Sequence, residues 1–455
     1  MERTIHVILK PLRRFAIQKP NASFLLFMAM IVAMLLANSP WAPAYHHLLS
    51  FPIDLQANRF NFFAHHGEPM SMLAFVNDAL MAVFFFVIGL EIKQEVLIGE
   101  LSSVRKALLP ILAATGGMIV PVLCYMLVCT SSPEADGAAI PMATDIAFAL
   151  AVLGLLGKRV PLSMRIFLTA LAVVDDIGGI IIIALFYSGS IAFGPLLISL
   201  AILLALYMGG KMRIHAMAFY YVAGFVVWLL FLESGIHPTI AGVLVAFTVP
   251  ARPSVKLDSF TAQMKGYLEM LDYTEVRQSK KAMVLTPTQI QVLNNIHTLA
   301  DRTISPLQAI ANRLHPVVNY FILPLFAFVN AGVTFGDIRP ETLWNVPLAV
   351  FAGLFIGKTI GIFSFSYLFV KSGLVAMPAG MSKRTLLGVA MLGGIGFTVA
   401  LFIANLSFDA AAAGGADLLN QAKLGVFAGS FVSGVAGYML LKRTLPRGEA
   451  PGLAR

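Results

Sequence analysis

Long apolar runs alternate with short polar connections along almost the whole chain. Each run has roughly the length of ~20 residues that an α-helix needs to cross the hydrocarbon core of a bilayer. Twelve such runs can be marked, at residues 23–40, 72–92, 107–130, 139–156, 163–187, 193–210, 214–232, 236–250, 315–334, 345–370, 384–406 and 422–441. The pattern predicts an all-α polytopic membrane protein with twelve transmembrane helices.

The composition supports this prediction and excludes other classes. Of the 455 residues, 58% are hydrophobic and only 12% are charged, whereas soluble domains carry about 25% charged residues. The net charge of +9 does not indicate a nucleic-acid-binding protein, because the basic residues lie between the apolar runs. Cys124 and Cys129 share one apolar run and are predicted to be small apolar side chains, so no metal or redox cofactor is expected.

Lysine and arginine are concentrated in alternate connections. The connection 251–314 alone holds eight of them, whereas the opposite set of connections holds only Arg59 and Arg339. Cytoplasmic loops of membrane proteins carry an excess of these residues. The asymmetry therefore predicts that both termini lie in the cytoplasm and that the number of spans is even.

Two connections are long enough to contain structure of their own. Residues 41–71, on the outside, alternate apolar and polar residues and predict a small periplasmic loop or hairpin. Residues 251–314 form a long cytoplasmic loop, which is either a solvated linker or one or two amphipathic helices. Within it, Thr286 and Gln289 have the spacing of a capping box at a helix start.

Charged side chains interrupt three of the predicted spans near their middle. Asp175 and Asp176 are central in the fifth run, Lys358 is central in the tenth, and Asp145, preceded by Thr144, lies in the fourth. A charge at the centre of a bilayer is costly and is functional by default. The alternative is a buried ion-pair cluster that fixes helix packing, but three carboxylates and one lysine at one depth favour an ion pathway.

Proline and glycine weaken two spans. Pro141 lies near the start of the short fourth run, and Gly393, Gly394 and Gly396 lie near the centre of the eleventh. Spans 3–5 and 10–12 have opposite topology, as an inverted repeat requires, and interrupted segments in corresponding halves mark the binding site of many transporters. Close helix packing is the alternative explanation for the three glycines.

Adjacent residues of a helix point about 100° apart, so Asp175 and Asp176 cannot both face one small ion. We expect one of them to face the ion path and the other to face a partner. Lys358 is the midplane cation available for that role. Gly178 and Gly179 leave room for a neighbouring helix.

Seven stretches of the sequence, in this order, match a known family: NDALMAVFFFVIGLEIKQE (77–95), MATDIAFAL (142–150), ALAVVDDIGGIIIIALFY (170–187), SGIHPTIAG (234–242), LPLFAFVNAGV (323–333), GLFIGKTIG (353–361) and GGIGFTVALFIA (393–404). Together they cover nearly every span. Through these stretches the chain resembles the NhaA-type Na+/H+ antiporters of bacteria.

The resemblance implies twelve helices with the fourth and eleventh broken and crossing, within a single antiporter domain over residues 1–455. It implies that Asp176 and Asp145 bind Na+ or Li+ with Thr144 beside them, and that Asp175 pairs with Lys358. It also implies electrogenic exchange, in which more protons enter than Na+ leaves, in support of pH and sodium homeostasis.

The family further implies a homodimer, formed partly through residues 41–71, in the bacterial inner membrane. Lipid is then the surrounding partner, and no nucleic acid is expected. Glu91 and Glu95 match the family's pH-sensing region. Gln94, Ala311 and Asn312 depart from the family pattern there.

His315, His237 and Asp78 lie toward the ends of predicted spans. Each histidine either packs at a helix end or modulates the response to pH. Asp78 is either a pathway residue or an anchor at the outer end.

Carboxylates that can hold either protons or a hard cation make the two compete for one site, and alternating access then yields antiport. Three other classes of membrane protein are alternatives. An intramembrane aspartyl protease would need its two aspartates on separate helices, with a GxGD motif on one of them. A passive cation channel fits a midplane lysine and broken helices poorly. A Na+ symporter would differ from an antiporter only in coupling.

Overall fold

The computed structural model describes residues 22–446, apart from residues 55, 58–59, 62–63, 66–67, 190, 213, 273–277, 280–281, 284, 335–339, 411 and 413. Described helices of the first half are α2 (Ala22–Ala37), α3 (Ala42–Ser50), α4 (Met72–Phe75), α5 (Met81–Ile98), α6 (Val104–Met126), α7 (Ile146–Gly154), α8 (Leu162–Phe186), α9 (Phe193–Lys211), α10 (Met217–Ser234) and α11 (Thr239–Thr248). Those of the second half are α12 (Leu257–Asp272), α13 (Pro287–Thr303), α14 (Pro306–Val317), α15 (Leu323–Asn330), α16 (Val346–Ala352), α17 (Lys358–Lys371), α18 (Lys383–Leu392), α19 (Phe397–Ser407) and α20 (Gly415–Thr444).

Short segments of other helical types join or extend these helices. Three π-helical stretches, Val76–Leu80, Val318–Ile322 and Gly353–Gly357, connect α4 to α5, α14 to α15 and α16 to α17. Tighter 3-10 turns occupy Glu100–Ser102, Glu134–Met142, Gly157–Arg159 and Pro340–Trp344. Single π-helical turns are rare and often occur at functional sites, and one of them here leads directly into Lys358.

In the part of the chain that the structure describes, seven helices are long and apolar enough to cross a membrane. The number rises to ten if each of three bent helix pairs is one span. Helix α11 is apolar but shorter. The predicted class, a polytopic all-α membrane protein, is thereby confirmed, while the number of twelve helices stays a prediction.

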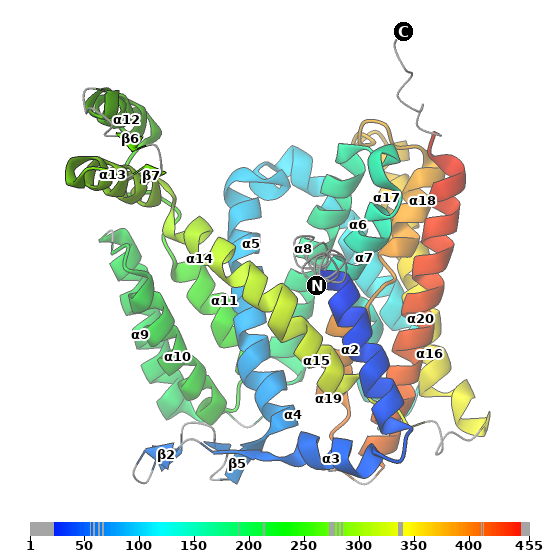
Figure 1. Ribbon diagram of the computed structural model, residues 1–455. Helices are drawn as coiled ribbons and strands as arrows, with labels where there is room; N and C mark the ends of the chain where they lie inside the picture. The colour runs from blue at the N-terminus through cyan, green and yellow to red at the C-terminus, as the bar shows by residue number, and fades with distance from the viewer. Residues whose placement is uncertain are drawn as a thin grey trace, which may run out of the picture.

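The bent pairs include the fourth and eleventh apolar runs. The axis of Glu134–Met142 makes an angle of 45° with α7, and α18 makes an angle of 47° with α19. The third bent pair, α2 and α3, turns by 115°, so that α3 runs across the end of the bundle (Figure 1).

The two long connections lie at opposite ends of the helix bundle (Figure 1). Residues 41–71 contain α3, which was not expected, followed by the short strands β1 (Pro52–Ile53), β2 (Gln56–Ala57), β3 (Phe60–Asn61), β4 (Ala64–His65) and β5 (Glu68–Ser71). All pairings are antiparallel, with β5 between β1 and β4, and β2 against β3. This connection therefore contains short antiparallel strand pairs, and its periplasmic location stays a prediction.

The connection 251–314 holds α12, a strand pair β6 (Gln278–Ser279) and β7 (Ala282–Met283), and α13. The predicted capping box is confirmed, because Thr286 and Gln289 exchange side-chain and backbone hydrogen bonds at the start of α13. The next helix, α14, begins at Pro306, earlier than the expected 315. Ser305 caps it, and the polar residues Gln308, Asn312 and Arg313 are helical although they precede the apolar run.

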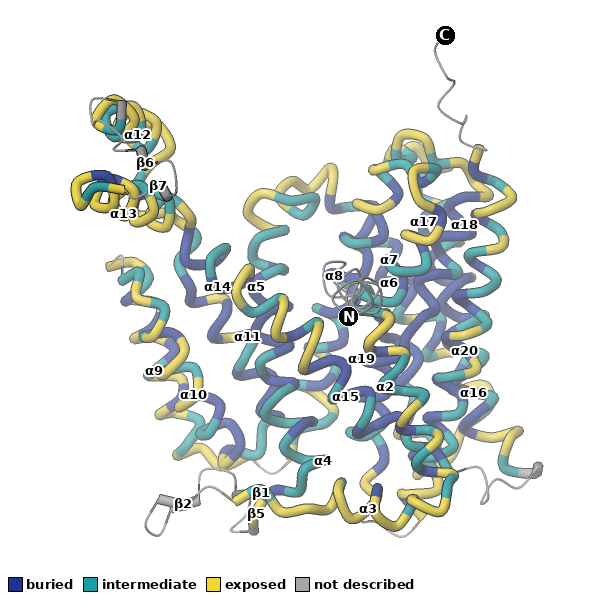
Figure 2. Tube along the Cα trace, viewed as in Figure 1, coloured by how far each residue is buried: buried dark blue, intermediate teal, exposed yellow. Residues whose placement is uncertain are grey.

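Buried residues follow the inner faces of the helices, whereas α9, α12 and α13 are largely exposed (Figure 2). Small residues allow close contact where two helices cross. A side chain on Gly116 of α6 or on Gly361 of α17 would overlap with the carbonyl oxygen of the other glycine. Packing of this kind is a main source of helix association in membranes.

Candidate functional site

The two interrupted helices meet through the backbone at Asp145. This residue has an extended conformation just before α7, and its Oδ1 caps that helix by accepting a hydrogen bond from Phe148 N at 3.0 Å. Its own N–H donates to the carbonyl oxygen of Ile395 at 2.6 Å, in the break between α18 and α19. The two breaks are therefore in direct contact.

The Asp145 carboxylate also contacts the start of α19. Its Oδ2 accepts a hydrogen bond from Thr398 N at 3.0 Å and one from Thr398 Oγ1 at 2.5 Å. The N-terminus of a helix carries a partial positive charge, which stabilises an anion placed there. Asp145 is 2% exposed, so these contacts replace water around the carboxylate.

Lys358 forms an ion pair with Asp175, and both side chains are buried. Lys358 Nζ also donates to Thr144 Oγ1 at 2.9 Å. The Thr144 hydroxyl lies 2.5 Å from Asp175 Oδ2 and 2.8 Å from the carbonyl oxygen of Gly393, either of which can accept its proton. These contacts join α8, α17 and the two breaks at one point.

Asp176 faces a different way. It lines a small cavity of about 60 Å³ that Asp145, Thr144 and Thr398 also line. Within the described residues, the Asp176 carboxylate has no hydrogen-bond partner and no ion pair, although the residue is only 8% exposed. A water molecule needs roughly 10–15 Å³ by this measure, so the cavity has room for a small hydrated or dehydrated cation.

The site carries an excess of negative charge when its groups are ionised. Asp145, Asp175 and Asp176 are buried beside a single buried ammonium group, that of Lys358. Two carboxylates therefore remain without a protein cation among the described residues of the site. Uncompensated charges are too costly to bury, so protons or cations have to neutralise them.

The three glycines of the eleventh run pack closely. A side chain on Gly396 would meet Leu354 Cδ2 at 2.8 Å and the Ala143 carbonyl oxygen at 3.0 Å, and one on Gly393 would meet Ile362 Cδ1 at 2.5 Å. A side chain on Gly394 would overlap with the Leu354 carbonyl oxygen. Close packing and the helix break thus occur together here.

Of the two glycines after the aspartate pair, only Gly178 has a close neighbour. A side chain there would overlap with Met118 of α6, whereas nothing lies within 4 Å of one at Gly179.

The residues predicted to respond to pH do not lie together in the structure. Glu91 and His315 line the same cavity as Asp176, and their Oε1 and Nε2 atoms are 3.3 Å apart. Glu95 instead accepts a hydrogen bond from Glu100 N at 2.9 Å, beyond the end of α5. Of the positions that depart from the family pattern, Gln94 is partly buried, Ala311 is buried and Asn312 is exposed.

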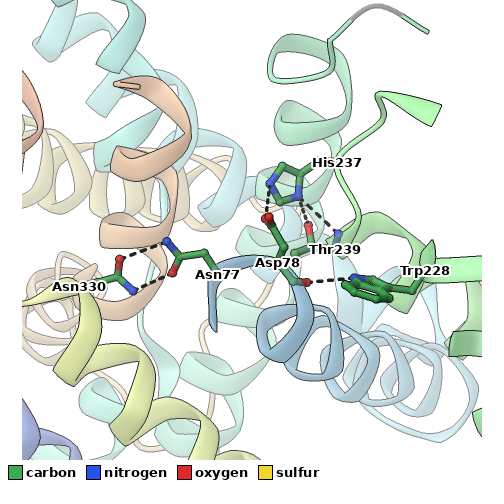
Figure 3. A network of polar contacts seen from close by, with 6 residues as sticks. All are labelled: Asn77, Asp78, Trp228, His237, Thr239 and Asn330. Atoms are coloured by element: carbon green, nitrogen blue, oxygen red, sulfur yellow. Dashed lines mark hydrogen bonds and ion pairs between the residues drawn. The ribbon is translucent and has the colours of Figure 1, made fainter. Parts of the chain in front are cut away.

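Asp78 and His237 belong to a second polar network (Figure 3), and neither is among the described residues that line the cavity of Asp176. Their Oδ1 and Nε2 atoms are 3.7 Å apart, and His237 Nδ1 contacts Thr239 Oγ1 at 2.7 Å. Trp228 Nε1 donates to the Asp78 carbonyl oxygen at 3.2 Å. The structure therefore does not bring these two residues to the cavity that Asp145 and Asp176 line.

Several polar residues of these networks were not predicted from the sequence. Thr398 contacts Asp145, and Ser430 of α20 contacts the start of α19. Asn330 exchanges side-chain hydrogen bonds with Asn77 at 3.3 and 2.8 Å (Figure 3), and Asn405 donates to it at 2.9 Å. Uncharged polar residues are common in apolar helices, so their sequence positions alone do not single them out.

In the described part of the chain, no three His, Cys, Asp or Glu side chains are grouped as metal ligands. The oxygen atoms that line the cavity near Asp145 and Asp176 include those of Thr144 and Thr398. Carboxylate, hydroxyl and carbonyl oxygens are the ligands that hard cations prefer.

Comparisons with known proteins place the chain among described sequences. A sequence family described as Na+/H+ antiporter 1 matches residues 13–441. A protein of Parabacteroides distasonis named Na(+)/H(+) antiporter NhaA is 82% identical over 447 residues, which cover 98% of this chain and 99% of that protein. Proteins of the same name from Porphyromonas gingivalis and Sulfurimonas denitrificans are 51% and 41% identical, over 98% and 97% of this chain and the same shares of their own lengths.

Proposed function

Because the chain belongs to the Na+/H+ antiporter 1 family, we propose that it exchanges Na+ for H+ across a membrane. Proteins of this family are secondary transporters and not enzymes, so the ion gradients supply the driving force. The site described above then has to bind a cation in one step and protons in another.

The observation that carries the proposal is the buried excess of carboxylates beside one lysine. Asp176 and Asp145 line the cavity, while Asp175 is paired with Lys358. Asp176 and Asp145 are proposed to bind Na+ or Li+, with Thr144 beside them. The same two carboxylates take up protons when the cation leaves.

This charge balance favours electrogenic exchange. Two carboxylates need two protons for neutrality but bind a single Na+, and the Asp175–Lys358 pair offers a further proton-exchanging group. More positive charge then moves with the protons than with the cation. At low pH protons occupy the site and transport stalls, without a separate sensor.

The direct contact of the two breaks supports alternating access around a fixed site. We propose that the fourth and eleventh runs are broken, crossing spans of an inverted repeat within a twelve-helix bundle. Asp145 would then lie where helix ends meet near the midplane, as in other inverted-repeat transporters. Movement of α19 relative to α7 would change the side from which the cavity is reached.

The remaining proposals concern orientation and assembly. The distribution of Lys and Arg supports cytoplasmic termini in the inner membrane of a bacterium, with residues 41–71 outside and 251–314 inside. A homodimer formed partly through residues 41–71 is proposed from the family resemblance. Glu91 and His315, which line the cavity, are the residues proposed to modulate the response to pH.

Exchange can be tested in proteoliposomes that hold an imposed pH gradient, acidic inside, reported by a fluorescent amine. Addition of Na+ or Li+, but not K+, is expected to dissipate the gradient. A gradient that persists after Na+ addition would exclude antiport. Protein-free liposomes provide the control, and collapse by K+ as well would indicate a nonselective channel.

Charge movement needs a second measurement. Clamping the membrane potential at zero with K+ and valinomycin is expected to accelerate Na+-driven exchange if net charge moves. Equal rates with and without the clamp would show electroneutral exchange.

A further inference from the structure

The helix that follows the eleventh break lacks a cap of its own. Gly396 occupies the N-cap position of α19 and has no side chain that can accept a hydrogen bond. The first backbone N–H groups of any helix have no partner within that helix. At membrane depth there is no bulk water to satisfy them, so other parts of the protein have to do so.

Ser430 of the neighbouring helix α20 fills this role. Its Oγ lies 3.2 Å from Gly396 N and 3.2 Å from Phe397 N, and accepts from both. The next amide along the chain, Thr398 N, donates to Asp145 Oδ2 at 3.0 Å. Three successive amides are thus divided between a neutral hydroxyl and the carboxylate of the candidate cation site.

We propose that Ser430 is a positioning residue of the cation site. By accepting from Gly396 N at the N-cap and from Phe397 N at the first position of α19, it fixes where that helix begins and leaves Thr398 N to donate to Asp145. This inference rests on the proposed function, because it assigns Ser430 a role in cation binding at Asp145. Ser430 itself is not a ligand, and among the described residues it does not line the cavity of Asp176.

Loss of the Ser430 hydroxyl would leave two buried N–H groups without an acceptor. Asp145 already accepts from the same turn, so a small shift of α19 brings Phe397 N toward it. Each extra N–H donor occupies a carboxylate lone pair that Na+ would otherwise use. Cation affinity should therefore fall more than the maximal rate of exchange.

The chain offers a matched control on the same helix. Ser433 is fully buried one turn further along α20, and its Oγ has no hydrogen-bond partner in the described part of the chain. Ser433→Ala removes a hydroxyl of the same size from the same helix but breaks no such bond. A conservative variant is also available, because Ser430 borders an apolar groove that can hold the extra methyl group of Ser430→Thr.

The test compares wild type, Ser430→Ala, Ser430→Thr and Ser433→Ala in proteoliposomes, with initial exchange rates measured against Na+ concentration. For Ser430→Ala we expect the apparent KM for Na+ to rise roughly fivefold, the equivalent of one hydrogen bond, with a smaller change in maximal rate. The apparent KM of Ser430→Thr and Ser433→Ala should stay within about twofold of wild type. Ser430→Thr keeps the hydroxyl that accepts the bond, and Ser433 makes no such bond in the described part of the chain.

An unchanged KM in Ser430→Ala, or the same change in Ser433→Ala, would overturn the positioning role while wild-type exchange stands. Absence of Na+-driven exchange in wild type would instead overturn the proposed function, and this inference with it. If Ser430→Ala cannot be purified in a folded form, Ser430→Cys replaces it with the same expected direction, because sulfur is a weak acceptor.

Discussion

Thr398 donates two hydrogen bonds to Asp145, one from its backbone amide at 3.0 Å and one from its hydroxyl at 2.5 Å. These residues belong to the two interrupted segments and are 253 positions apart in the chain. The contact places the carboxylate at the positive end of α19. Under the proposed function, this contact couples the occupancy of Asp145 to the position of α19, which begins in the middle of the bundle.

Thr398→Val is expected to shift the pH dependence of exchange. A donor to the ionised carboxylate favours that form over the protonated form, so its loss lets protons compete with Na+ at higher pH. The pH of half-maximal activity should rise by roughly one unit, the equivalent of a hydrogen bond to a charged group. Initial rates in proteoliposomes between about pH 6 and 9 measure this shift, because the range brackets neutral pH.

Thr359→Val is the control for this prediction. The Thr359 hydroxyl is buried near the site, beside Lys358 in sequence, but has no hydrogen-bond partner among the described residues. Its removal should leave the pH profile unchanged. A profile of Thr398→Val that matches wild type would argue against a role of the hydroxyl at Asp145.

Asp176→Asn should abolish Na+-driven exchange without loss of stability. The Asp176 carboxylate lines the cavity but makes no hydrogen bond or ion pair in the described part of the chain, so the amide breaks none. Exchange assays should show no response to Na+ or Li+ at any pH, and the melting temperature in detergent should not fall. Asp136→Asn, at an exposed position outside the site, should behave as wild type.

Full exchange by Asp176→Asn in proteoliposomes would refute the assignment of this residue as a cation ligand. A fall in melting temperature would instead show that Asp176 is held by contacts that stabilise the fold.

The charged half of the site could be predicted from the sequence, because charges stand out in apolar runs. Asp145, Asp175, Asp176 and Lys358 were singled out by their depth alone. Which aspartate pairs with Lys358 could not be derived in this way, since it depends on how α8 and α17 rotate against each other. The family resemblance supplied that assignment, and the structure places Asp175 against Lys358.

Apart from Thr144, which the family resemblance implied, the uncharged residues around the site could not be predicted. Thr398 and Ser430 contact the site only because α7, α19 and α20 meet, and hydroxyls of this kind occur in many apolar helices.

The ends of the helices could not be predicted from the apolar runs alone either. Helix α20 begins at Gly415 rather than at the expected 422, because its first two turns are polar and extend beyond the apolar run.

Lys358→Met is expected to destabilise the protein strongly. It leaves the buried Asp175 carboxylate without its cation, and breaking one side of a buried ion pair costs about 3–5 kcal/mol. Thermal unfolding in detergent should show a lower melting temperature. The double variant Asp175→Asn/Lys358→Met should recover part of the loss, because it removes both charges.

A melting temperature of Lys358→Met equal to that of wild type would contradict the ion pair. A double variant that is less stable than Lys358→Met would also contradict the ion pair, because removal of the unpaired Asp175 charge should raise the stability.

Gly357→Ala should also lower stability, through packing rather than charge. A methyl carbon at this position would lie 2.6 Å from Pro121 Cα and 3.1 Å from Pro121 N, so the backbone of α6 has to move. Overpacking of this kind costs about 1–3 kcal/mol of stability. Because Gly357 directly precedes Lys358, the displacement should also reduce exchange.

Gly179→Ala is the control, since nothing lies within 4 Å of its added carbon and alanine favours a helix over glycine by about 1 kcal/mol. The two melting temperatures should therefore move in opposite directions, and a shift of both in the same direction would contradict the close contact between α6 and the segment that carries Lys358.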